Sequence, residues 1–430
     1  MNRQFPRIDD FRHADAATLR NLYEELLQRI TVREPDLRVF EMQAPDSDQV
    51  RRDLDALLAD CPDSRPPLFG APVGVKGLYR VRGQRIRCGS LLPADLFSGP
   101  EASLVTALRR AGALILGISA TSEFASKEPA ATVNPHRAGH TPGGSSSGSA
   151  AGVAAGFFPL ALGSQTLGSV IRPASFCGIT GFKPSYGRIP MDGIIPFAPS
   201  LDHAGFFCAT PAEAAAVFDV LVPGELPGLS PFSAARPICL GIPCGPYLAQ
   251  TDPGALAVFH AAVTSLAAAD IRCLEISCFE DIAEINQRVT KLAYAEMAQS
   301  HAAWFDRYQA LYRPGTREQI MAGRMEGEAA IISGRECRKR LRDSLHRLMR
   351  EHRLDAWVCP SAVGEADATL AATGDPVMNQ PWSLAGLPAL SLPVTTGQSG
   401  LPLGIQLVGA HGDDRRLLAL GNTLFSRFRS

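Results

Sequence analysis

Apolar side chains near the start of the chain recur at helical spacing and predict a first helix, whose buried face consists of Leu19, Leu22, Tyr23, Leu26 and Ile30. Asp15 precedes this face and can cap the helix, because its carboxylate can accept hydrogen bonds from the free backbone N–H groups of the first turn. A second amphipathic stretch predicts a helix over 48–59. Both helices are expected to pack on the outside of the core and to carry no catalytic group.

Further along, short apolar runs alternate with helical stretches, a pattern typical of parallel strands joined by helices. A helix over 101–112 leads into a buried strand over 113–117, and a strand-helix-strand unit is predicted over 238–276. Other expected elements are a helix that starts at Thr121, a small-residue helix over 150–155, and strands or turns over 158–162, 181–190 and 193–198. The predicted fold class is α/β, with a large mixed β-sheet between layers of helices and right-handed crossovers.

The second half of the chain contains a segment unlike the rest. Residues 224–237 are rich in Pro, Gly and Ser and predict a surface connection. Residues 279–353 are helical and charged, with an expected break at Pro314-Gly315. After them the chain returns to the sheet and ends in a predicted helix over 413–428. The whole therefore reads as one domain, 1–430, with a helical insertion.

Composition narrows the classes of function. The 430 residues have a net charge of −1, a pI near 6.8 and no Lys/Arg-rich run, so there is no electrostatic footprint for nucleic acid. The first residues lack the apolar segment of a signal peptide, which predicts a cytoplasmic protein. The 10 cysteines are scattered without a C-x-x-C pair, so we expect buried thiols in a reducing compartment and no metal site.

One stretch has no charged residue at all between Arg137 and Arg172. A membrane-spanning helix is disfavoured there because the stretch contains prolines and many glycines and serines. Two glycine–serine loops, 143–149 and 163–169, flank the small-residue helix and are bordered by large apolar side chains. We expect both loops to be packed against the core, with hydroxyl and backbone N–H groups pointing into a pocket.

These loops, with the Arg-Pro at 172–173 after the second, resemble the signature of the amidase signature family of serine hydrolases. The match runs to Lys183-Pro184 and extends more weakly over the rest of the core and the C-terminal part. The resemblance implies the amidase signature fold, with a catalytic core at 70–205. It also implies that the insertion at 279–353 lies near the mouth of the active site, where it either shapes the substrate pocket or forms a solvated cover.

The family uses a Ser-Ser-Lys arrangement, which the resemblance carries over to Lys76, Ser145 and Ser169. Lys76 ends a short apolar run, and taken alone it is better explained as a strand-end lysine that reaches solvent. Burial lowers the pKa of a lysine toward neutrality, so an uncharged Lys76 can take a proton from Ser145 while Ser145 takes one from the nucleophile Ser169. The resemblance also implies a cis peptide bond between Gly144 and Ser145.

The resemblance assigns the oxyanion-stabilising N–H groups to the backbone of Thr166, Leu167 and Gly168. It assigns substrate contacts to Arg172, Gly144 and Ser146, and Ser146 is also expected to orient Lys76. Two roles stay open for Arg172: a buried structural guanidinium, or recognition of a substrate carboxylate, as in the malonamidase-like members whose motif this chain resembles.

Two residues depart from the family pattern. Gly77 replaces an Asp that commonly follows the lysine, which would loosen that strand end. Leu167 replaces a Gly in the oxyanion turn, and a leucine cannot take a positive φ cheaply. Asp202 and His203 suggest a triad with Ser169, but the family uses no histidine, and the matching Asp is expected to be a structural hydrogen-bonding group.

The leading hypothesis is a stand-alone amidohydrolase that acts on a small-molecule amide and needs no cofactor, metal, nucleic acid or membrane. A homodimer is the family-level expectation. Two alternatives remain at this point: the A subunit of a tRNA-dependent amidotransferase, or a catalytically impaired homologue that binds a partner.

Overall fold

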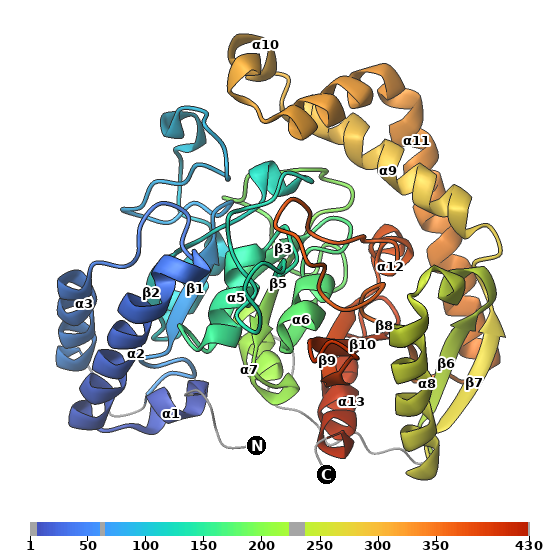
Figure 1. The fold of residues 1–430 in the computed structure, drawn as a ribbon, viewed down its shortest axis with the longest axis horizontal. Helices are drawn as coiled ribbons and strands as arrows, with labels where there is room; N and C mark the ends of the chain where they lie inside the picture. The colour runs from blue at the N-terminus through green and yellow to red at the C-terminus, as the bar shows by residue number, and fades with distance from the viewer. Residues whose placement is uncertain (1–6, 61–64, 223–236, 429–430) are drawn as a thin grey trace.

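The computed structural model describes residues 7–60, 65–222 and 237–428, so the predicted surface connection at 224–237 lies almost entirely outside the described residues. Its centre is a mixed sheet in the order β2-β1-β3-β5-β4-β9-β10-β8-β6-β7 (Figure 1). The strands are β1 (Pro72–Lys76), β2 (Leu114–Ser119), β3 (Leu160–Gln165), β4 (Thr180–Lys183), β5 (His203–Cys208), β6 (Cys239–Cys244), β7 (Arg272–Ser277), β8 (Ala356–Pro360), β9 (Ala389–Thr396) and β10 (Pro402–Val408). The predicted α/β class with a large mixed sheet is confirmed.

Parallel strands form the two ends of this sheet and antiparallel strands its middle. At one end β1 pairs in parallel with β2 and β3, and at the other β6 pairs in parallel with β7 and β8. The two predicted units are confirmed, because α4 (Ser103–Arg110) leads into β2 and α8 (Pro253–Ala268) connects β6 with β7. Since β1 and β3 are parallel, their carboxyl ends lie at the same edge of the sheet.

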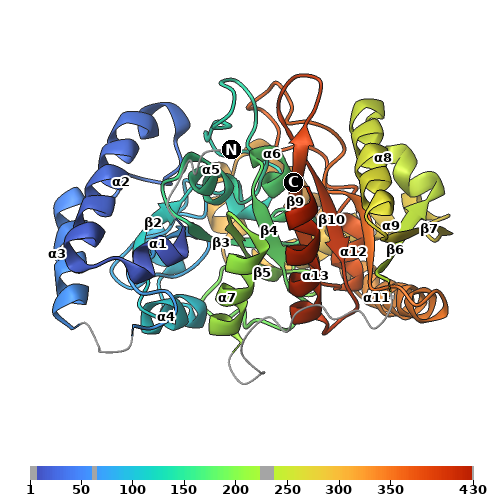
Figure 2. The same cartoon turned by 90° about the horizontal axis from the view of Figure 1, so that it is seen from below.

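Helices cover both faces of the sheet (Figure 2). One layer contains α5 (Ser147–Ala155), α6 (Ile171–Cys177) and α8, and the other contains α4, α7 (Pro211–Leu221) and α13 (Asp414–Arg427). Helix α5 consists only of Ser, Gly, Ala and Val and is buried along its whole length. A Cβ atom at Gly152 would lie 2.2 Å from the ring of Phe158, so glycine is required for this close approach to the sheet.

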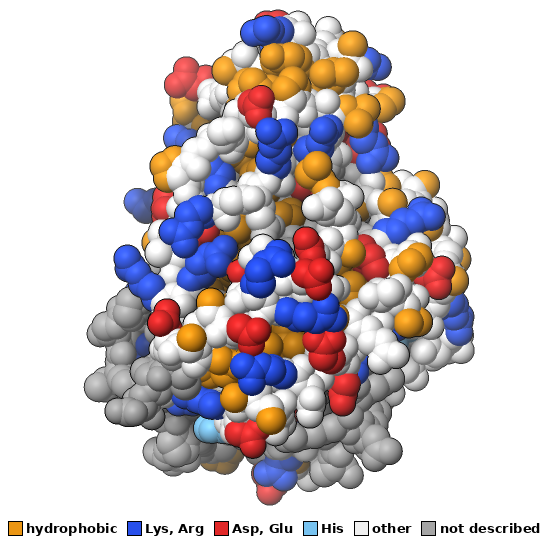
Figure 3. Space-filling model, turned by 90° about the vertical axis from the view of Figure 1, so that its left-hand side faces the viewer, with side chains coloured by type: hydrophobic (Ala, Val, Ile, Leu, Met, Phe, Trp, Pro, Cys, Tyr) orange, Lys and Arg blue, Asp and Glu red, His pale blue; other side chains and the backbone are white. Residues whose placement is uncertain are grey.

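The N-terminal helices lie beside the β2 end of the sheet: α1 (Ile8–His13), α2 (Ala16–Leu37) and α3 (Ser47–Ala59). Asp15 caps α2 as predicted, because its carboxylate accepts a hydrogen bond from the backbone N–H of Thr18 at 2.7 Å. An exposed salt bridge of 2.7 Å joins Arg51 of α3 to Glu24 of α2. Figure 3 shows this side of the molecule, where basic and acidic side chains are interspersed over the surface. The predicted outer position of α2 and α3 is confirmed.

The insertion forms α9 (Ile282–Ser300), α10 (Phe305–Tyr308) and α11 (Pro314–Glu351), and α9 and α11 pack against each other and against α12 (Gln380–Ala385). Pro314 stands in the first turn of α11, where a missing N–H group removes no intrahelical bond, so the expected break is the start of a helix. Short 3₁₀ turns complete the fold: η1 (Ala94–Phe97), η2 (Glu123–Ala125), η3 (Gly245–Gln250) and η4 (Gln309–Leu311).

The helix expected to start at Thr121 does not form, and only η2 is present there. Phe124 and Ala125 both have positive φ values, 50° and 60°, which end any helix. The tertiary structure explains this backbone, because the Phe124 ring is fully buried beside His301 and Tyr312 of the insertion. Burial of the aromatic ring therefore overrides the local helical preference.

Candidate active site

Lys76 is the last residue of β1 and is completely buried. Its Nζ donates a hydrogen bond to Ser145 Oγ at 2.8 Å and another to Ser164 Oγ at 2.9 Å, with a longer contact of 3.4 Å to the Ser164 carbonyl oxygen. Burial lowers the pKa of Lys76 to about 7, and the charge of Asp202 opposes this shift only in part. A strand-end lysine that reaches solvent is therefore excluded.

The first glycine–serine loop brings Ser145 to this lysine. The Gly144–Ser145 peptide bond is cis, as predicted. The carbonyl oxygen of Ser145 accepts a hydrogen bond from the backbone N–H of Ser122 at 3.0 Å, and the Ser147 hydroxyl donates to the carbonyl of Gly143 at 2.8 Å. The loop is thus fixed on both sides of Ser145.

Gly144 and Ser146 are not among the residues that line the cavity that contains Ser145, and their substrate contacts stay predictions. The Ser146 hydroxyl is fully buried and instead donates to the carbonyl of Ser164 at 3.2 Å and accepts from the Ser164 N–H at 3.3 Å. Gly144 contributes its carbonyl oxygen, which accepts from Arg172. Ser146 therefore orients Lys76 only indirectly, through Ser164.

Ser164 was missed in the sequence, although it is the second hydroxyl bound to Lys76. It lies in the second glycine–serine loop, at the end of β3, and no residue pattern shows that β3 is the neighbour of β1. Only the parallel pairing of these two strands places residue 164 beside residue 76.

The second loop forms a tight turn between β3 and α6. Ser169 lines the same cavity as Ser145, is 7% exposed, and its hydroxyl makes no hydrogen bond to another residue that the structure describes. The side-chain oxygen Oε1 of Gln165 accepts 2.9 Å bonds from the backbone N–H groups of Val170 and Ile171 and so fixes the turn from within. Within the described chain, no acceptor is found for the backbone N–H groups of Thr166, Leu167 and Gly168, which precede Ser169 in this turn.

Leu167 fits this turn without strain. It is not among the residues with positive φ, so the expected conformational conflict does not arise. Its carbonyl accepts a hydrogen bond from the Ser383 hydroxyl at 2.7 Å, and its half-buried side chain lines the cavity. At Gly168, in contrast, a Cβ atom would come within 2.5 Å of Asn379 Oδ1, so a side chain is excluded there.

Asp202 is a structural hydrogen-bonding group, as expected. Its carboxylate accepts bonds from the Thr166 hydroxyl at 2.5 Å and from the backbone N–H groups of Phe197 and Ala198 at 2.9 and 3.0 Å. Burial raises the pKa of Asp202 to about 6 despite these donors. The neighbouring His203 contacts the carbonyl of Gln165 and does not line the cavity, which excludes the histidine triad.

Arg172 is buried, and its guanidinium has both structural hydrogen bonds and one nitrogen that is available to a substrate carboxylate. Its Nε donates to the Thr373 carbonyl at 2.8 Å and its Nη2 to the Gly144 carbonyl at 2.7 Å, which is a structural role. Its Nη1 is buried with no partner among the described residues, and a Cβ atom at Gly168 would lie only 2.9 Å from it. One donor nitrogen of the guanidinium is therefore left over beside the turn at 166–168.

The cavity that contains Ser145 and Ser169 measures about 240 Å³. The insertion contributes Thr290 and Tyr294 from α9 and Gln319 from α11 to its wall. The segment that precedes α12 closes another side with Thr373, Gly374 and Pro376, and α12 itself contributes Gln380. Of the two alternatives for the insertion, its position in the wall favours the one in which it shapes the pocket.

The strand end at Gly77 is not loosened. The backbone N–H of Gly77 donates to the Ser119 carbonyl at 2.9 Å, which continues the pairing of β1 with β2. A Cβ atom at Gly77 would lie 2.7 Å from Glu41 Oε2 and 2.8 Å from Oε1, so the Glu41 carboxylate fills the space of a residue-77 side chain. Glu41 was also missed in the sequence, because nothing there connects it to residue 77.

No group of three or more His, Cys, Asp or Glu residues suited to a metal ion occurs in the described part of the chain. The described helices also include none that is long and apolar enough to cross a bilayer.

The amidase family model matches residues 21–418. The chain belongs to the amidase family. Like other members it is an amide-cleaving hydrolase. The A subunit of the glutamyl-tRNA(Gln) amidotransferase from Synechococcus sp. (strain RCC307) is 31% identical over 458 aligned positions, which cover 95% of this chain and 93% of the relative.

Solved structures of amidases superpose on this amidase along nearly its whole length. A crystal structure described as an amidase has a TM-score of 0.86 at 28% identity and covers 96% of each chain. A peptide amidase from Stenotrophomonas maltophilia has a TM-score of 0.80 at 26% identity, with 97% of this chain and 94% of the other covered. These similarities confirm the amidase signature fold.

Proposed function

We propose that this amidase hydrolyses a small-molecule carboxamide, with Ser169 as nucleophile, Ser145 as proton relay and Lys76 as base. The observation that carries the proposal is the pair of hydrogen bonds from a fully buried lysine to two hydroxyl groups, one of which shares a cavity with Ser169. A lysine whose pKa is about 7 is about half uncharged at pH 7, and the uncharged form can accept a proton.

In the proposed reaction, Lys76 Nζ takes the proton of the Ser145 hydroxyl while Ser145 Oγ takes that of Ser169. Ser169 Oγ then forms a bond to the amide carbon, and the carbonyl oxygen becomes an oxyanion. The proton returns through Ser145 to the leaving nitrogen as the C–N bond breaks. Water adds to the acyl-enzyme by the same relay in reverse and releases the carboxylic acid.

The oxyanion would be bound by the N–H groups of the turn at 166–168. Donors without an acceptor in the resting protein suit this role, because they need no rearrangement when charge develops on the substrate. Loss of one such donor typically raises the barrier by about 3 kcal/mol. The bond from Thr166 to Asp202 would hold this turn in place.

The cavity also restricts the substrate. Its volume of about 240 Å³ is smaller than the roughly 300–1,000 Å³ of common ligand pockets and suits a small amide. The free Nη1 of Arg172 would bind an acceptor oxygen of the substrate, best a carboxylate, because a guanidinium is a charged and planar donor. Amides that bear a carboxylate are therefore the proposed class.

Labelling with a fluorophosphonate tests the nucleophile. The wild-type protein should gain one adduct, on Ser169, and Ser169→Ala should gain none, as read by intact-protein and peptide mass spectrometry. Ser147→Ala is the matched control, since its hydroxyl lies in the first loop and bonds to the Gly143 carbonyl, and it should label like the wild type. Adduct formation in Ser169→Ala at the wild-type level would exclude this nucleophile, and a wild type that never labels would favour an impaired homologue.

A second candidate function is the A subunit of a tRNA-dependent amidotransferase, because relatives with that name match 91–95% of the chain. The two candidates differ in what the purified chain does alone. Hydrolysis of simple amides without any added subunit supports the stand-alone enzyme. Activity that requires partner subunits and aminoacyl-tRNA, with glutamine as the amide, supports the second candidate.

A further inference from the structure

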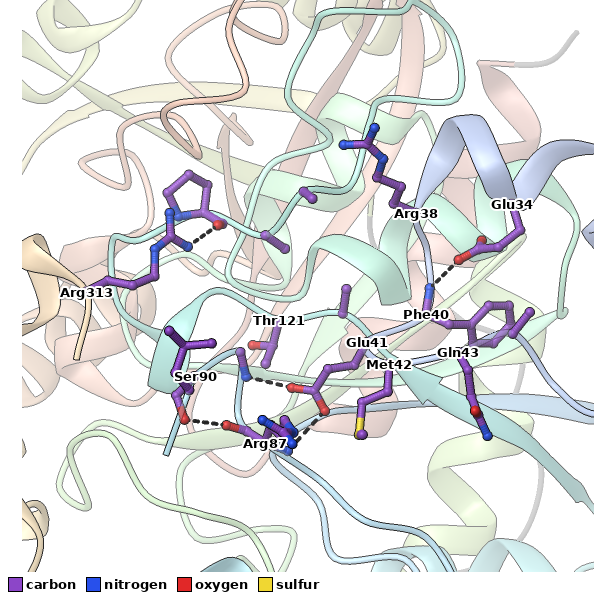
Figure 4. Close-up of a pocket in the computed structure, with 17 residues that line it drawn as sticks. Glu34, Arg38, Phe40, Glu41, Met42, Gln43, Arg87, Ser90, Thr121 and Arg313 are labelled. Carbon is purple, nitrogen blue, oxygen red and sulfur yellow. Dashed lines mark hydrogen bonds between the residues drawn. The ribbon is translucent and has the colours of Figure 1, made fainter. Parts of the chain in front are cut away.

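Glu41 lies in the connection between α2 and α3 and lines a second cavity of about 600 Å³ (Figure 4). Its Oε1 accepts the backbone N–H of Gly89 at 2.6 Å, and its Oε2 accepts that of Arg87 at 3.3 Å. Both oxygens of one carboxylate therefore hold a single loop, 87–90. An ionised carboxylate is suited to this, because it accepts hydrogen bonds at both oxygens and donates none.

The same carboxylate lies against the residue that follows Lys76. A Cβ atom at Gly77 would stand 2.7 to 2.8 Å from both oxygens and from the Cδ of Glu41. Gly77 is not among the glycines with positive φ, so its backbone could carry a side chain if the carboxylate were absent. Space, and not backbone conformation, makes residue 77 a glycine.

The loop that Glu41 holds is two contacts away from the catalytic loop. The carbonyl of Cys88 accepts the backbone N–H of Phe124 at 2.8 Å, and a Cβ at Gly89 would come within 2.5 Å of the Thr121 carbonyl. The adjacent Ser122 donates its N–H to the carbonyl of Ser145. Glu41 therefore lies against Gly77, the residue that follows Lys76. It is connected to Ser145 by way of the loop 87–90 and the segment 121–124.

The Glu41 carboxyl group lies in a buried position that disfavours its charged form. Burial raises the pKa of Glu41 to about 7, even though its two N–H donors and Arg87 act in the opposite direction. A glutamine would serve poorly, because its amide nitrogen would face one of the two N–H donors.

We propose that Glu41 is a positioning residue for the catalytic centre, and that it supplies from a distant segment the carboxylate that residue 77 lacks. Glu41 and Gly77 form a matched pair that fixes the end of β1 and the loop 87–90 relative to Ser145. The effect on catalysis rests on the proposed role of Lys76, whereas the effect on the loop does not.

A double-mutant cycle tests the pair, with Glu41→Gly, Gly77→Asp and the combination of both. Each single variant should lower kcat about tenfold with KM within about twofold, the first because the loop is released and the second because two carboxylates compete for one space. The combination should recover kcat to within about threefold of the wild type, because the new side chain at position 77 can extend into the vacated volume.

Alkylation of Cys88 gives a second readout that is independent of activity. Its thiol is fully buried at the centre of the loop, so Glu41→Gly should speed its modification by iodoacetamide at least about tenfold, and Gly77→Asp in the same chain should restore protection. Glu34→Gly is the matched control, because the Glu34 carboxylate lines the same cavity and accepts hydrogen bonds from the N–H groups of Val39 and Phe40. Gly77→Asp should not reverse any effect that Glu34→Gly has on Cys88 modification or on kcat.

Three results would overturn the proposal. One is a combined variant no better than Glu41→Gly, and another is a Cys88 that stays protected in Glu41→Gly. The third is an exposed Cys88 with wild-type kcat, which would show that the loop is held without any effect on catalysis. Failure of the Ser169 labelling, in contrast, would leave the Cys88 pattern unchanged.

Discussion

Two strand ends of the central sheet carry a fully buried lysine, Lys76 at the end of β1 and Lys183 at the end of β4. Burial lowers the pKa of both lysines to about 7. Lys76 donates to the hydroxyls of Ser145 and Ser164, whereas Lys183 donates to the backbone carbonyls of Pro184 at 3.0 Å and Leu387 at 2.5 Å. The two sites are thus alike in burial and titration but differ in their partners.

This difference decides which lysine can be a base. A hydroxyl gives up a proton to an uncharged amine, whereas a carbonyl oxygen has no proton to give. Lys183 therefore connects β4 to Leu387, two residues before β9, and its contacts among the described residues include no hydroxyl that could give it a proton. A depressed pKa alone would mark both sites as catalytic, and the acceptor atoms separate them.

Replacement of each lysine by methionine is the strongest test of the difference in role between Lys76 and Lys183. Lys76→Met should lower kcat at least about 10³-fold while the protein stays folded, because the relay loses its base. Lys183→Met should keep kcat per folded molecule within about twofold. Steady-state kinetics with circular dichroism as the folding control would measure both, and equal losses in the two variants would refute the distinction.

Lys183→Met should instead weaken the fold, by about 2–3 kcal/mol in urea unfolding, because two buried carbonyls lose their donor. The loss should grow with pH. Since the pKa of Lys183 is about 7 when folded and near 10.5 when unfolded, the unfolded chain holds more protons between these values, and folding gains stability as pH rises. The gap between wild type and Lys183→Met should widen by up to about 3 kcal/mol from pH 7 to pH 9. A gap that is constant over this range would contradict a buried, uncharged Lys183.

Ser164→Ala should lower kcat about tenfold to thirtyfold, because Lys76 loses one of the two hydroxyls that orient its amine. Substrate affinity should change little, since Ser164 does not line the cavity with Ser169. Ser149→Ala provides the control, because its hydroxyl is also buried behind the first loop but bonds to Ser119 and the Leu162 carbonyl. A Ser164→Ala enzyme as active as Ser149→Ala would show that Ser145 alone orients the lysine.

The pH profile of kcat/KM should show the smallest change. In the proposed reaction the uncharged form of Lys76 is active, so the rate should rise with pH to a plateau above about pH 8 and fall about fivefold between pH 7 and pH 6. The Lys183→Met variant should keep this inflection, because its lysine takes no part in the relay. If Lys183→Met moved the inflection, the titrating group would be Lys183 and not Lys76, which would contradict the proposal.

Local features of the sequence were sufficient to predict elements whose contacts come from neighbouring residues along the chain. The cap at Asp15 and the apolar face of α2 are readable because both depend on neighbours along the chain. The helix expected at Thr121 failed because burial of Phe124 against the insertion decides its backbone. Propensity is a weak guide wherever a distant segment supplies the contacts.

The same distinction between local and distant contacts applies to the candidate active site. Resemblance of the glycine-rich loops to a family predicted Lys76, Ser145 and Ser169 as site residues, whereas the positions of Ser164 and Glu41 depend on which strands and loops become neighbours. Gly144 and Ser146, which belong to the same loop as Ser145 but do not line its cavity, illustrate the same limit. A motif names the residues of a loop, but it does not say which of them face the cavity and which face the protein.

The wall formed by Thr373, Gly374 and Gln380 has a consequence for protein synthesis. These residues come late in the chain, after the insertion, and β9 must still insert beside β4 to complete the sheet. A nascent polypeptide that already contains both serines and the lysine therefore has no finished cavity until these residues have been made. Hydrolysis of cellular amides should begin only after translation has passed this last wall, so that synthesis itself delays the appearance of activity.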